Sequence, residues 1–338
     1  MLNLIDNIST ARKNLQIMSL KDSLLSLTKQ EPKDTDINAI FNEIVADLNP
    51  EMLFNYLSEK SSTVLFGSFK CSYHPYLSLE CAKISEIEPS MNFVRLEHIR
   101  CVTHSKATNG LENEQVVAIF PENFANRVVS FNDPVYYFVN KFSNRHHKFT
   151  QPFILKTVIS NFLEPVIEIE GHKTYQLIAN WVHLHELTHR CGPMPIPQFL
   201  KEKSGKLSAA LEELRADLGV IKYCLIESSE ESILTALFVF AERLLAYPLF
   251  REKNNFDAIS SLIFWKHLRE AGFFANQNLK TLLSAVEDLN SIINVTELDS
   301  LKLVSIKQRR DYLNNFVQNY IGDIDELFNN YTIFWEHI

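Results

Sequence analysis

The sequence predicts an α+β protein in which a mixed α/β region, residues 1–170, precedes a mostly helical region, residues 171–338. Three observations lead to this expectation. With 338 residues and 46% hydrophobic content, the chain can bury one large core or two closely packed ones. Short runs rich in β-branched and aromatic residues recur between about residues 62 and 170. From Tyr175 onward, one helical pattern follows another, separated by prolines.

The N-terminal region begins with helical patterns and continues with strand patterns. Apolar residues recur at helical spacing from Leu2 to Leu27, and a second helix is expected from Ile37 to Leu48 after a polar stretch. The expected strands are Thr63–Phe66, Asn92–Leu96, Gln115–Phe120 and Pro165–Ile169. Together these elements predict that this half contains some sheet.

Two long helices are expected in the C-terminal region. The first runs from near Thr174 to Arg190 and ends at Cys191-Gly192-Pro193, because glycine and proline terminate helices. The proline-rich link from Gly192 to Pro197 can continue neither helix and forces the chain to reverse. The second helix, Lys206 to Ile226, therefore returns toward the first.

The charge and the cysteine content indicate which classes of partner and which cellular compartment to expect. A formal charge of −8 and a pI of about 5.8, without a cluster of Lys and Arg among aromatics, argue against nucleic acid or a membrane as partner. The five cysteines include no C-x-x-C pair, which indicates reduced intracellular thiols. The N-terminus lacks a secretory pattern, and the longest apolar run, Ile233 to Ala241, is too short to span a bilayer. Cytoplasmic residence is therefore expected.

The first of the two long helices carries the motif His185-Glu186-Leu187-Thr188-His189. Residues four apart share one face of a helix, so His185 and His189 can bind one ion while Glu186 reaches an adjacent water. A catalytic zinc ion commonly has two His and one Glu as ligands and keeps a fourth position open. The motif therefore predicts a Zn2+ site with Glu186 as its general base.

Glu213, on the second long helix, is the candidate third ligand. Asp217 follows four residues later on the same face, and a metal-bound histidine usually donates its second N–H to such an acid. This spacing favours Glu213 over the alternatives Glu212 and Glu242. Glu212 points about 100° away from Glu213 on a helix. There it can accept from a ligand histidine or pair with Arg215.

A hydrolytic zinc site also benefits from a donor that stabilises a developing oxyanion. The candidates are His267, Tyr247 and Arg243, although such side chains in helices more often pack or face solvent. His183 is expected on nearly the opposite side of its helix from the motif, in a structural role. His146 and His147 are expected in a solvated loop.

The two motifs together, His-Glu-Leu-Thr-His and Glu-Glu-Leu-Arg-Ala-Asp, resemble those of the gluzincin superfamily of zinc metallopeptidases over about residues 175 to 275. The second motif looks especially like the glutamate-bearing helix of the dipeptidyl peptidase III family, and like that of an uncharacterised group of bacterial zincin-like proteins. The dipeptidyl peptidase III motif has an extra residue between its histidines, and those chains are longer. The resemblance therefore does not imply exopeptidase activity.

The resemblance also implies a role for each residue of the two motifs. It makes His185, His189 and Glu213 the zinc ligands and Glu186 the base that takes a proton from the metal-bound water. It makes Glu212 and Asp217 acids that support the ligands from behind.

The expected function is zinc-dependent hydrolysis of a peptide or a small-molecule amide through a metal-activated water. Two His and one Glu also suit iron(II), so a non-hydrolytic metalloenzyme of small-molecule metabolism is one alternative. A binding module with a structural or vestigial zinc site is another. Structural sites are usually closed by four ligands and favour Cys. Cys191, two residues after His189, is the cysteine that would complete such a site.

Overall fold

The computed structural model describes residues 63–71, 74–107, 113–120, 134–250, 252 and 255–336. The helices expected within residues 1–60 lie outside this part of the chain. Two compact units are present: one takes in the described residues up to Glu88 and Glu97–Phe142, the other Pro89–Leu96 and the residues from Ser143 onward. A sheet lies in the first and helices dominate the second, so the α+β fold is confirmed. The expected division into residues 1–170 and 171–338 stays a prediction. The two units are defined by packing alone, which does not test a division by function.

The sheet unit contains a five-stranded mixed sheet in the order β1-β2-β3-β5-β4. Its strands are β1 (Thr63–Cys71), β2 (His74–Glu86), β3 (Ile99–Ala107), β4 (Ala118–Ile119) and β5 (Val135–Phe138). β3 and β5 run parallel, and the other neighbouring pairs are antiparallel. Val102 and Phe138, partners across β3 and β5, are fully buried. The strands expected at Thr63–Phe66 and Gln115–Phe120 are confirmed in β1 and, for two residues, in β4.

The strand expected at Pro165–Ile169 is wrong. Its first residues end the helix α8 (Ser160–Ile167), in which Leu163 and Val166 are both buried. Their spacing of three residues is that of a helix face. The apolar run at Pro165 therefore continues a helical pattern that begins earlier in the chain.

The strand expected at Asn92–Leu96 is also wrong, because these residues adopt no regular structure. They belong to a segment that packs on the helical unit. There the Met91 N–H donates to the buried Asn180 side chain at 3.1 Å. A side chain thus satisfies the backbone donor that directly precedes the expected strand.

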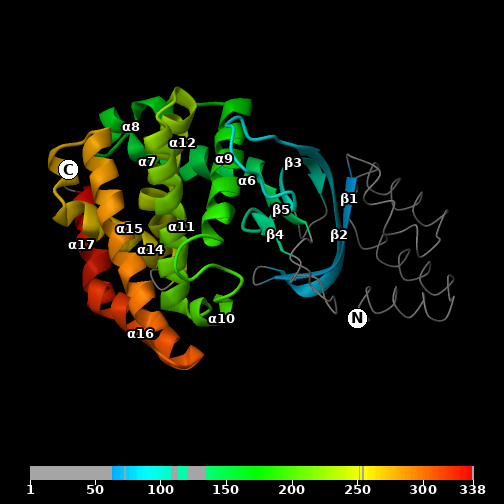
Figure 1. The fold of residues 1–338 in the computed structure, drawn as a ribbon. Helices are drawn as coiled ribbons and strands as arrows, with labels where there is room; N and C mark the ends of the chain where they lie inside the picture. The colour runs from blue at the N-terminus through cyan, green and yellow to red at the C-terminus, as the bar shows by residue number, and fades with distance from the viewer. Residues whose placement is uncertain are drawn as a thin grey trace, which may run out of the picture. The chain divides into compact units, whose positions relative to one another are not determined.

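The helical unit follows a short helix, α6 (Val139–Arg145), that begins in the sheet unit (Figure 1). Its further helices are α7 (Gln151–Ile154), α8, α9 (His172–His189), α10 (Leu200–Lys203), α11 (Lys206–Glu227), α12 (Glu230–Ala241), α13 (Tyr247–Phe250), α14 (Phe256–Glu270), α15 (Leu279–Leu301), α16 (Ile306–Ile321) and α17 (Ile324–Glu336). Two π-helical segments, η2 (His146–Thr150) and η3 (Glu242–Ala246), and a 3-10 turn, η4 (Phe273–Ala275), lie between them.

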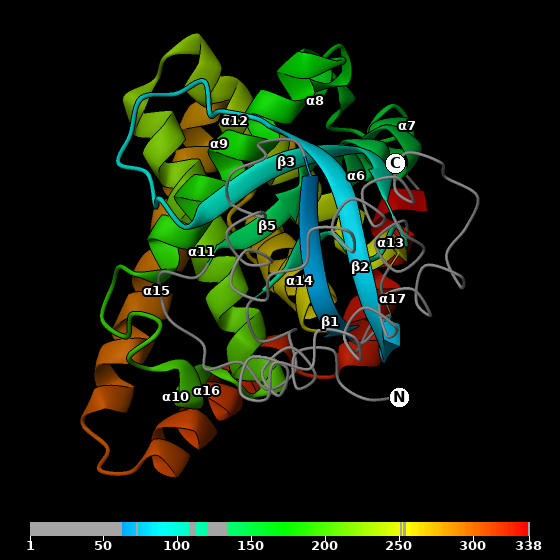
Figure 2. The same ribbon diagram turned by 90° about the vertical axis from the view of Figure 1, so that its right-hand side faces the viewer.

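The two long helices expected from the sequence are confirmed as α9 and α11, with small shifts at their ends. α11 contacts α9, α12, α14, α15 and α16, and Figure 2 shows α9, α11 and α12 side by side. Apolar residues such as Leu214 and Ile221 are fully buried in this packing. Because neighbours surround α11, several of the acidic residues that it carries are buried as well.

One described segment, Glu230–Leu249, is long and apolar enough to cross a membrane by length and composition. The most apolar window of this segment is 83% buried inside the protein. Its apolar surface is therefore accounted for by packing in the helical core.

α9 and α11 approach each other closely at Gly219. A Cβ atom built on Gly219 would lie 2.4 Å from Cγ2 of Thr188, which belongs to α9. Thr188 directly precedes His189 in the chain. The absence of a side chain at position 219 thus sets the distance between the two helices that carry the sequence motifs.

We expect Gly219→Ala to destabilise the protein by about 1–3 kcal/mol, because the added methyl group overpacks the contact with Thr188. At an exposed helical position the same change would stabilise by about 0.5–1 kcal/mol. Urea unfolding measures the difference. The double variant Thr188→Ala, Gly219→Ala should recover most of the loss, and a Gly219→Ala protein more stable than the wild type would contradict the close approach.

Candidate metal centre

α9 and α11 bring together the three residues that the sequence motifs select as metal ligands. One ligand atom each from His185, His189 and Glu213 lie within 4.8 Å of one another. The Nε2 atoms of His185 and His189 are 2.9 Å apart. Glu213 oxygens lie 3.3 Å from Nε2 of His185 and 3.8 Å from Nε2 of His189. The spacing of four residues on α9 produces this convergence, since it places both rings on the face toward α11.

Asp217 holds the ring of His185 from behind. Nδ1 of His185 donates to Oδ1 of Asp217 at 2.7 Å, and the indole N–H of Trp181 donates to the same oxygen at 2.7 Å. The other oxygen accepts from Nε of Arg243 at 2.5 Å. Burial alone would raise the pKa of Asp217, but Arg243 and His185 outweigh it and hold the pKa well below its usual range. Asp217 is therefore a buried carboxylate anion.

Glu212 does the same for His189. Nδ1 of His189 donates to Oε1 of Glu212 at 2.7 Å. Glu212 also pairs with Arg215 at 2.6 Å and with Lys203 at 2.5 Å. Burial opposes the charge, but hydrogen bonds from Arg215 and His189 and the charge of Lys203 hold the pKa of Glu212 well below its usual range. Of the roles considered from the sequence, Glu212 therefore both accepts from a histidine and pairs with Arg215.

These hydrogen bonds decide which nitrogen of each ring faces the centre. Because Nδ1 of each histidine donates to a carboxylate, Nε2 of a neutral ring carries the lone pair. Two such lone pairs and the Glu213 carboxylate then point at one place, an arrangement that suits a cation. Burial alone would lower the pKa of His185, but Asp217 and Glu213 raise it well above the usual value. The surroundings of His185 thus favour positive charge.

The charges around the centre show the same preference. Carboxylates outnumber cations in the ion-paired network of described residues that continues from Asp217 and Glu212. The carboxylates are Glu212, Glu213, Asp217, Asp257 and Glu297, and the cations are Lys203, Arg215 and Arg243. A divalent ion at the centre would reduce this excess of negative charge, and two imidazoles with one carboxylate are a donor set that zinc accepts.

Glu186 directly follows His185 on α9 and is half-buried. It does not belong to the three-residue ligand group. Cys191 is exposed, and its thiol donates to the Leu187 carbonyl at 3.3 Å. Within the described part of the chain, the ligand group therefore contains no sulfur atom and no fourth protein ligand.

Two of the three oxyanion-donor candidates lie behind Asp217. Arg243 is bonded to Asp217, and its Nη1 lies 3.4 Å from Asp257. The guanidinium carbon of Arg243 is 4.4 Å from the ring centre of Tyr247. Burial, which the neighbouring guanidiniums only partly offset, raises the pKa of Tyr247 to about 12, so its hydroxyl stays protonated at neutral pH.

His267, the third candidate, is placed among α14, α15 and α16. Its Nε2 donates to the Ala285 carbonyl at 3.1 Å, and its Nδ1 accepts from the Tyr320 hydroxyl at 3.0 Å. Burial lowers the pKa of His267. Both ring nitrogens are thus engaged away from the ligand group, and the oxyanion role of all three residues stays a prediction.

The solvated loop expected at His146 and His147 is wrong. Both residues begin the π-helical segment η2, and His146 is fully buried. Its Nδ1 donates to Oε1 of Glu242 at 2.9 Å, while Arg145 donates to Oε2 of Glu242 at 3.1 Å. Glu242, one alternative for the third ligand, is therefore occupied here and lies outside the ligand group. In the sequence, the charged pair Glu242-Arg243 interrupts an apolar run. Such charges are expected to be buried together with partners of opposite charge.

His183 is another histidine of α9, and the role expected of it is structural. His183 is buried, and its ring centre lies 6.3 Å from that of Phe93. It does not belong to the ligand group.

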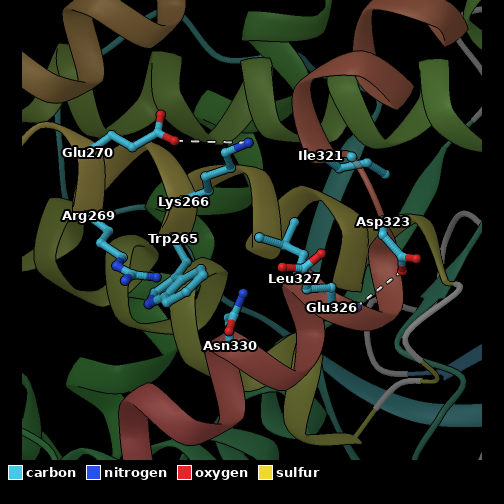
Figure 3. A pocket seen from close by; sticks show the side chains of 10 residues that line it. Trp265, Lys266, Arg269, Glu270, Ile321, Asp323, Glu326, Leu327 and Asn330 are labelled. Atoms are coloured by element: carbon cyan, nitrogen blue, oxygen red, sulfur yellow. Dashed lines mark hydrogen bonds and ion pairs between the residues drawn. The ribbon is translucent and has the colours of Figure 1, made fainter.

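A hollow of about 510 Å³ lies elsewhere in the helical unit, between α14, the turn that joins α16 to α17, and the start of α17 (Figure 3). None of the residues that line it belongs to the ligand group. Lys266 donates to the Tyr320 carbonyl at 2.6 Å and lies 3.9 Å from Glu270, so its charge is matched within the wall. The convergent titratable groups lie between α9 and α11 instead.

Comparison with known proteins identifies a fold. No protein-family model and no curated protein matches the chain. The structure of dipeptidyl peptidase III from Caldithrix abyssi is similar over 93% of this chain and 68% of that one, with a TM-score of 0.56 and 14% sequence identity. Dipeptidyl peptidase III from Corallococcus sp. strain EGB is similar over 88% of this chain and 61% of that one, with a TM-score of 0.49 and 11% identity. The first likeness shows a shared fold, and the chain spans about two thirds of that structure's length.

We expect Asp217→Asn and Glu212→Gln each to weaken Zn2+ binding by roughly 10–100-fold, because the carboxylates that orient ligand histidines contribute that much to affinity. Competition with a chelator of known zinc affinity measures the effect. Lys222→Gln serves as the control on α11, since Lys222 pairs with Glu287 on the surface. Equal zinc affinity in the wild type and both acid variants would show that these hydrogen bonds do not support a metal.

Proposed function

We propose that this protein is a zinc-dependent hydrolase that cleaves a peptide or another amide bond, with Glu186 as the general base. The observation that carries the proposal is the convergence of His185, His189 and Glu213, with a buried carboxylate on Nδ1 of each histidine. The fold shared with a dipeptidyl peptidase III structure supports a peptidase-like hydrolase at the level of the fold.

The residues present fit a catalytic zinc better than a structural one. Structural zinc sites normally use four protein ligands and favour cysteine, whereas the described residues offer three ligands without sulfur. Cys191, the cysteine nearest in sequence, is exposed and bonded to a backbone carbonyl. When bound, zinc supplies a Lewis acid and lowers the pKa of a water ligand.

The other roles in the proposed reaction, which are ligand support and proton transfer, belong to residues of the chain. Asp217 and Glu212 keep both Nδ1 atoms protonated, so that both Nε2 atoms are available as ligands. Glu186 stands next to a ligand on the same helix and is half-buried, so it lies beside the place where a metal-bound water would sit. In the proposed reaction Glu186 accepts the proton of the attacking water and passes it to the leaving amine.

The metal content of the purified protein tests the proposed site directly. We expect about one zinc per chain by inductively coupled plasma mass spectrometry, and none in the double variant His185→Ala, His189→Ala. Zinc at about 100 times its dissociation constant should stabilise the wild type by about 2.7 kcal/mol and leave the double variant unchanged. Stoichiometric iron instead of zinc would favour a non-hydrolytic metalloenzyme. Absence of any bound metal after reconstitution would refute the metal centre.

A substitution of the proposed base separates metal binding from chemistry. Glu186→Gln should keep the zinc affinity of the wild type but lower the turnover of a cleaved peptide or amide by roughly 10²–10⁴-fold, because the base is lost and the ligands remain. Screening a peptide and amide library with the zinc-loaded wild type provides the substrate for this comparison. Wild-type turnover in Glu186→Gln would assign the proton transfer to another group.

A further inference from the structure

The two π-helical segments of the helical unit, η2 and η3, pack against each other. π-helical turns are rare and occur frequently at functional sites. All five residues of η3 are buried, and two of them, Glu242 and Arg243, are charged. Because adjacent residues point to different sides of a helix, these two charges reach different neighbours. Glu242 pairs with residues at the start of η2, and Arg243 pairs with Asp217 on α11.

The ring of Tyr247 links the ion pair of Arg243 to the ion pair of Arg145. Its ring centre lies 4.4 Å from the guanidinium carbon of Arg243 and 4.8 Å from that of Arg145. The ring attracts both guanidiniums through cation–π interactions. A single aromatic ring therefore restrains Arg243, which in turn donates to Asp217.

Glu242 makes it possible for two cations to share that ring. Arg145 and Arg243 carry like charges that repel across a dry interior. Both oxygens of Glu242 are bonded, one to Arg145 and the other to His146, so its charge offsets that of Arg145. Without Glu242, the buried guanidinium of Arg145 would lose its main counter-charge and compete with Arg243 for Asp217 or Asp257.

We propose that Arg145, Glu242 and Tyr247 are positioning residues for the metal centre: they hold Arg243 against Asp217 and thereby fix the ring of His185. The inference rests on the proposed zinc site and adds residues that act on His185 through Arg243 and Asp217. Asp217 accepts from Arg243, Trp181 and His185. If Arg243 moves, Asp217 gains freedom to rotate, and the ring of His185 follows it. Removal of the positioning residues should therefore weaken zinc binding although none of them is a ligand.

The test measures Zn2+ affinity of the full-length protein by chelator competition in two variants that remove different parts of the network. We expect Glu242→Gln and Tyr247→Leu each to weaken zinc binding by about 10-fold, the lower end of the range for residues that orient ligands. Tyr247→Phe keeps the ring between the guanidiniums and should stay within about 3-fold of the wild type. Cobalt(II) bound in place of zinc should show an altered visible absorption spectrum in the first two variants, since that spectrum reports ligand geometry.

Tyr331→Leu is the matched control for general damage to the core. Tyr331 is buried, and its hydroxyl donates to the Leu244 carbonyl of η3 at 3.0 Å, on the same π-helical segment. The Tyr331 ring packs edge to face against Trp265 and Trp335. We expect Tyr331→Leu to lower thermal stability but to leave zinc affinity and the cobalt spectrum unchanged.

The outcomes separate this inference from the proposed function. Folded Tyr247→Leu and Glu242→Gln proteins that bind zinc as the wild type does would overturn the positioning role and leave the zinc site intact. Equal weakening by Tyr331→Leu would also overturn it, because loss of packing alone would then explain the effect. If Glu242→Gln does not fold, the comparison of Phe, Leu and wild type at position 247 decides the question. A wild type that binds no zinc overturns both proposals.

Discussion

The helical unit depends on burying two carboxylates behind two histidines. Asp217 and Glu212 must lie out of water to hold the rings of His185 and His189, yet an unpaired buried carboxylate costs on the order of several kcal/mol. Each acid is therefore matched by buried cations from neighbouring elements. Arg243 of η3 pairs with Asp217, while Lys203 of α10 pairs with Glu212. The elements around α11 thus supply charge as well as apolar surface.

The two histidines are supported by different parts of the fold. Behind Glu212 the partners are local: Lys203 and Arg215 are close in sequence, and Glu297 of α15 closes the group by pairing with Lys203 at 2.7 Å. Behind Asp217 the partners extend through Arg243 to residues near η2, far away in the sequence. α11 carries both acids and the candidate ligand Glu213, so the position of this one helix couples the two supports. The close contact between Gly219 and Thr188 fixes that position against α9.

The sequence predicts the part of the site that follows helical periodicity. His185 and His189, like Glu213 and Asp217, are four residues apart, and a helix places such pairs on one face whatever the rest of the chain does. The link between Arg145 and Glu242 follows no such rule, because it joins positions 97 residues apart through two π-helical turns. The expected loop at His146 was wrong for this reason: the polar run Asn144 to Lys148 looks solvated until its buried partner is known. The expected strand at Asn92–Leu96 was wrong, and these residues belong to the helical unit, where the neighbouring Met91 N–H donates to Asn180 of α9.

The side chains around the candidate metal centre differ in how far they are exposed, and this difference indicates the side from which a substrate approaches. The side chains of Asp217 and Glu212 are 0% and 3% exposed, whereas that of Glu213 is 28% exposed and that of His185 14%. Glu186 is half-buried as well. The carboxylates that keep the rings in place are thus sealed from water, while the proposed ligand carboxylate, Glu213, is partly exposed to it. A shared fold does not by itself produce this division, since folds host many functions. The division between buried and exposed carboxylates arises because each buried acid pairs with its own cation. Glu213 has no place in those pairs and faces both histidines and the solvent.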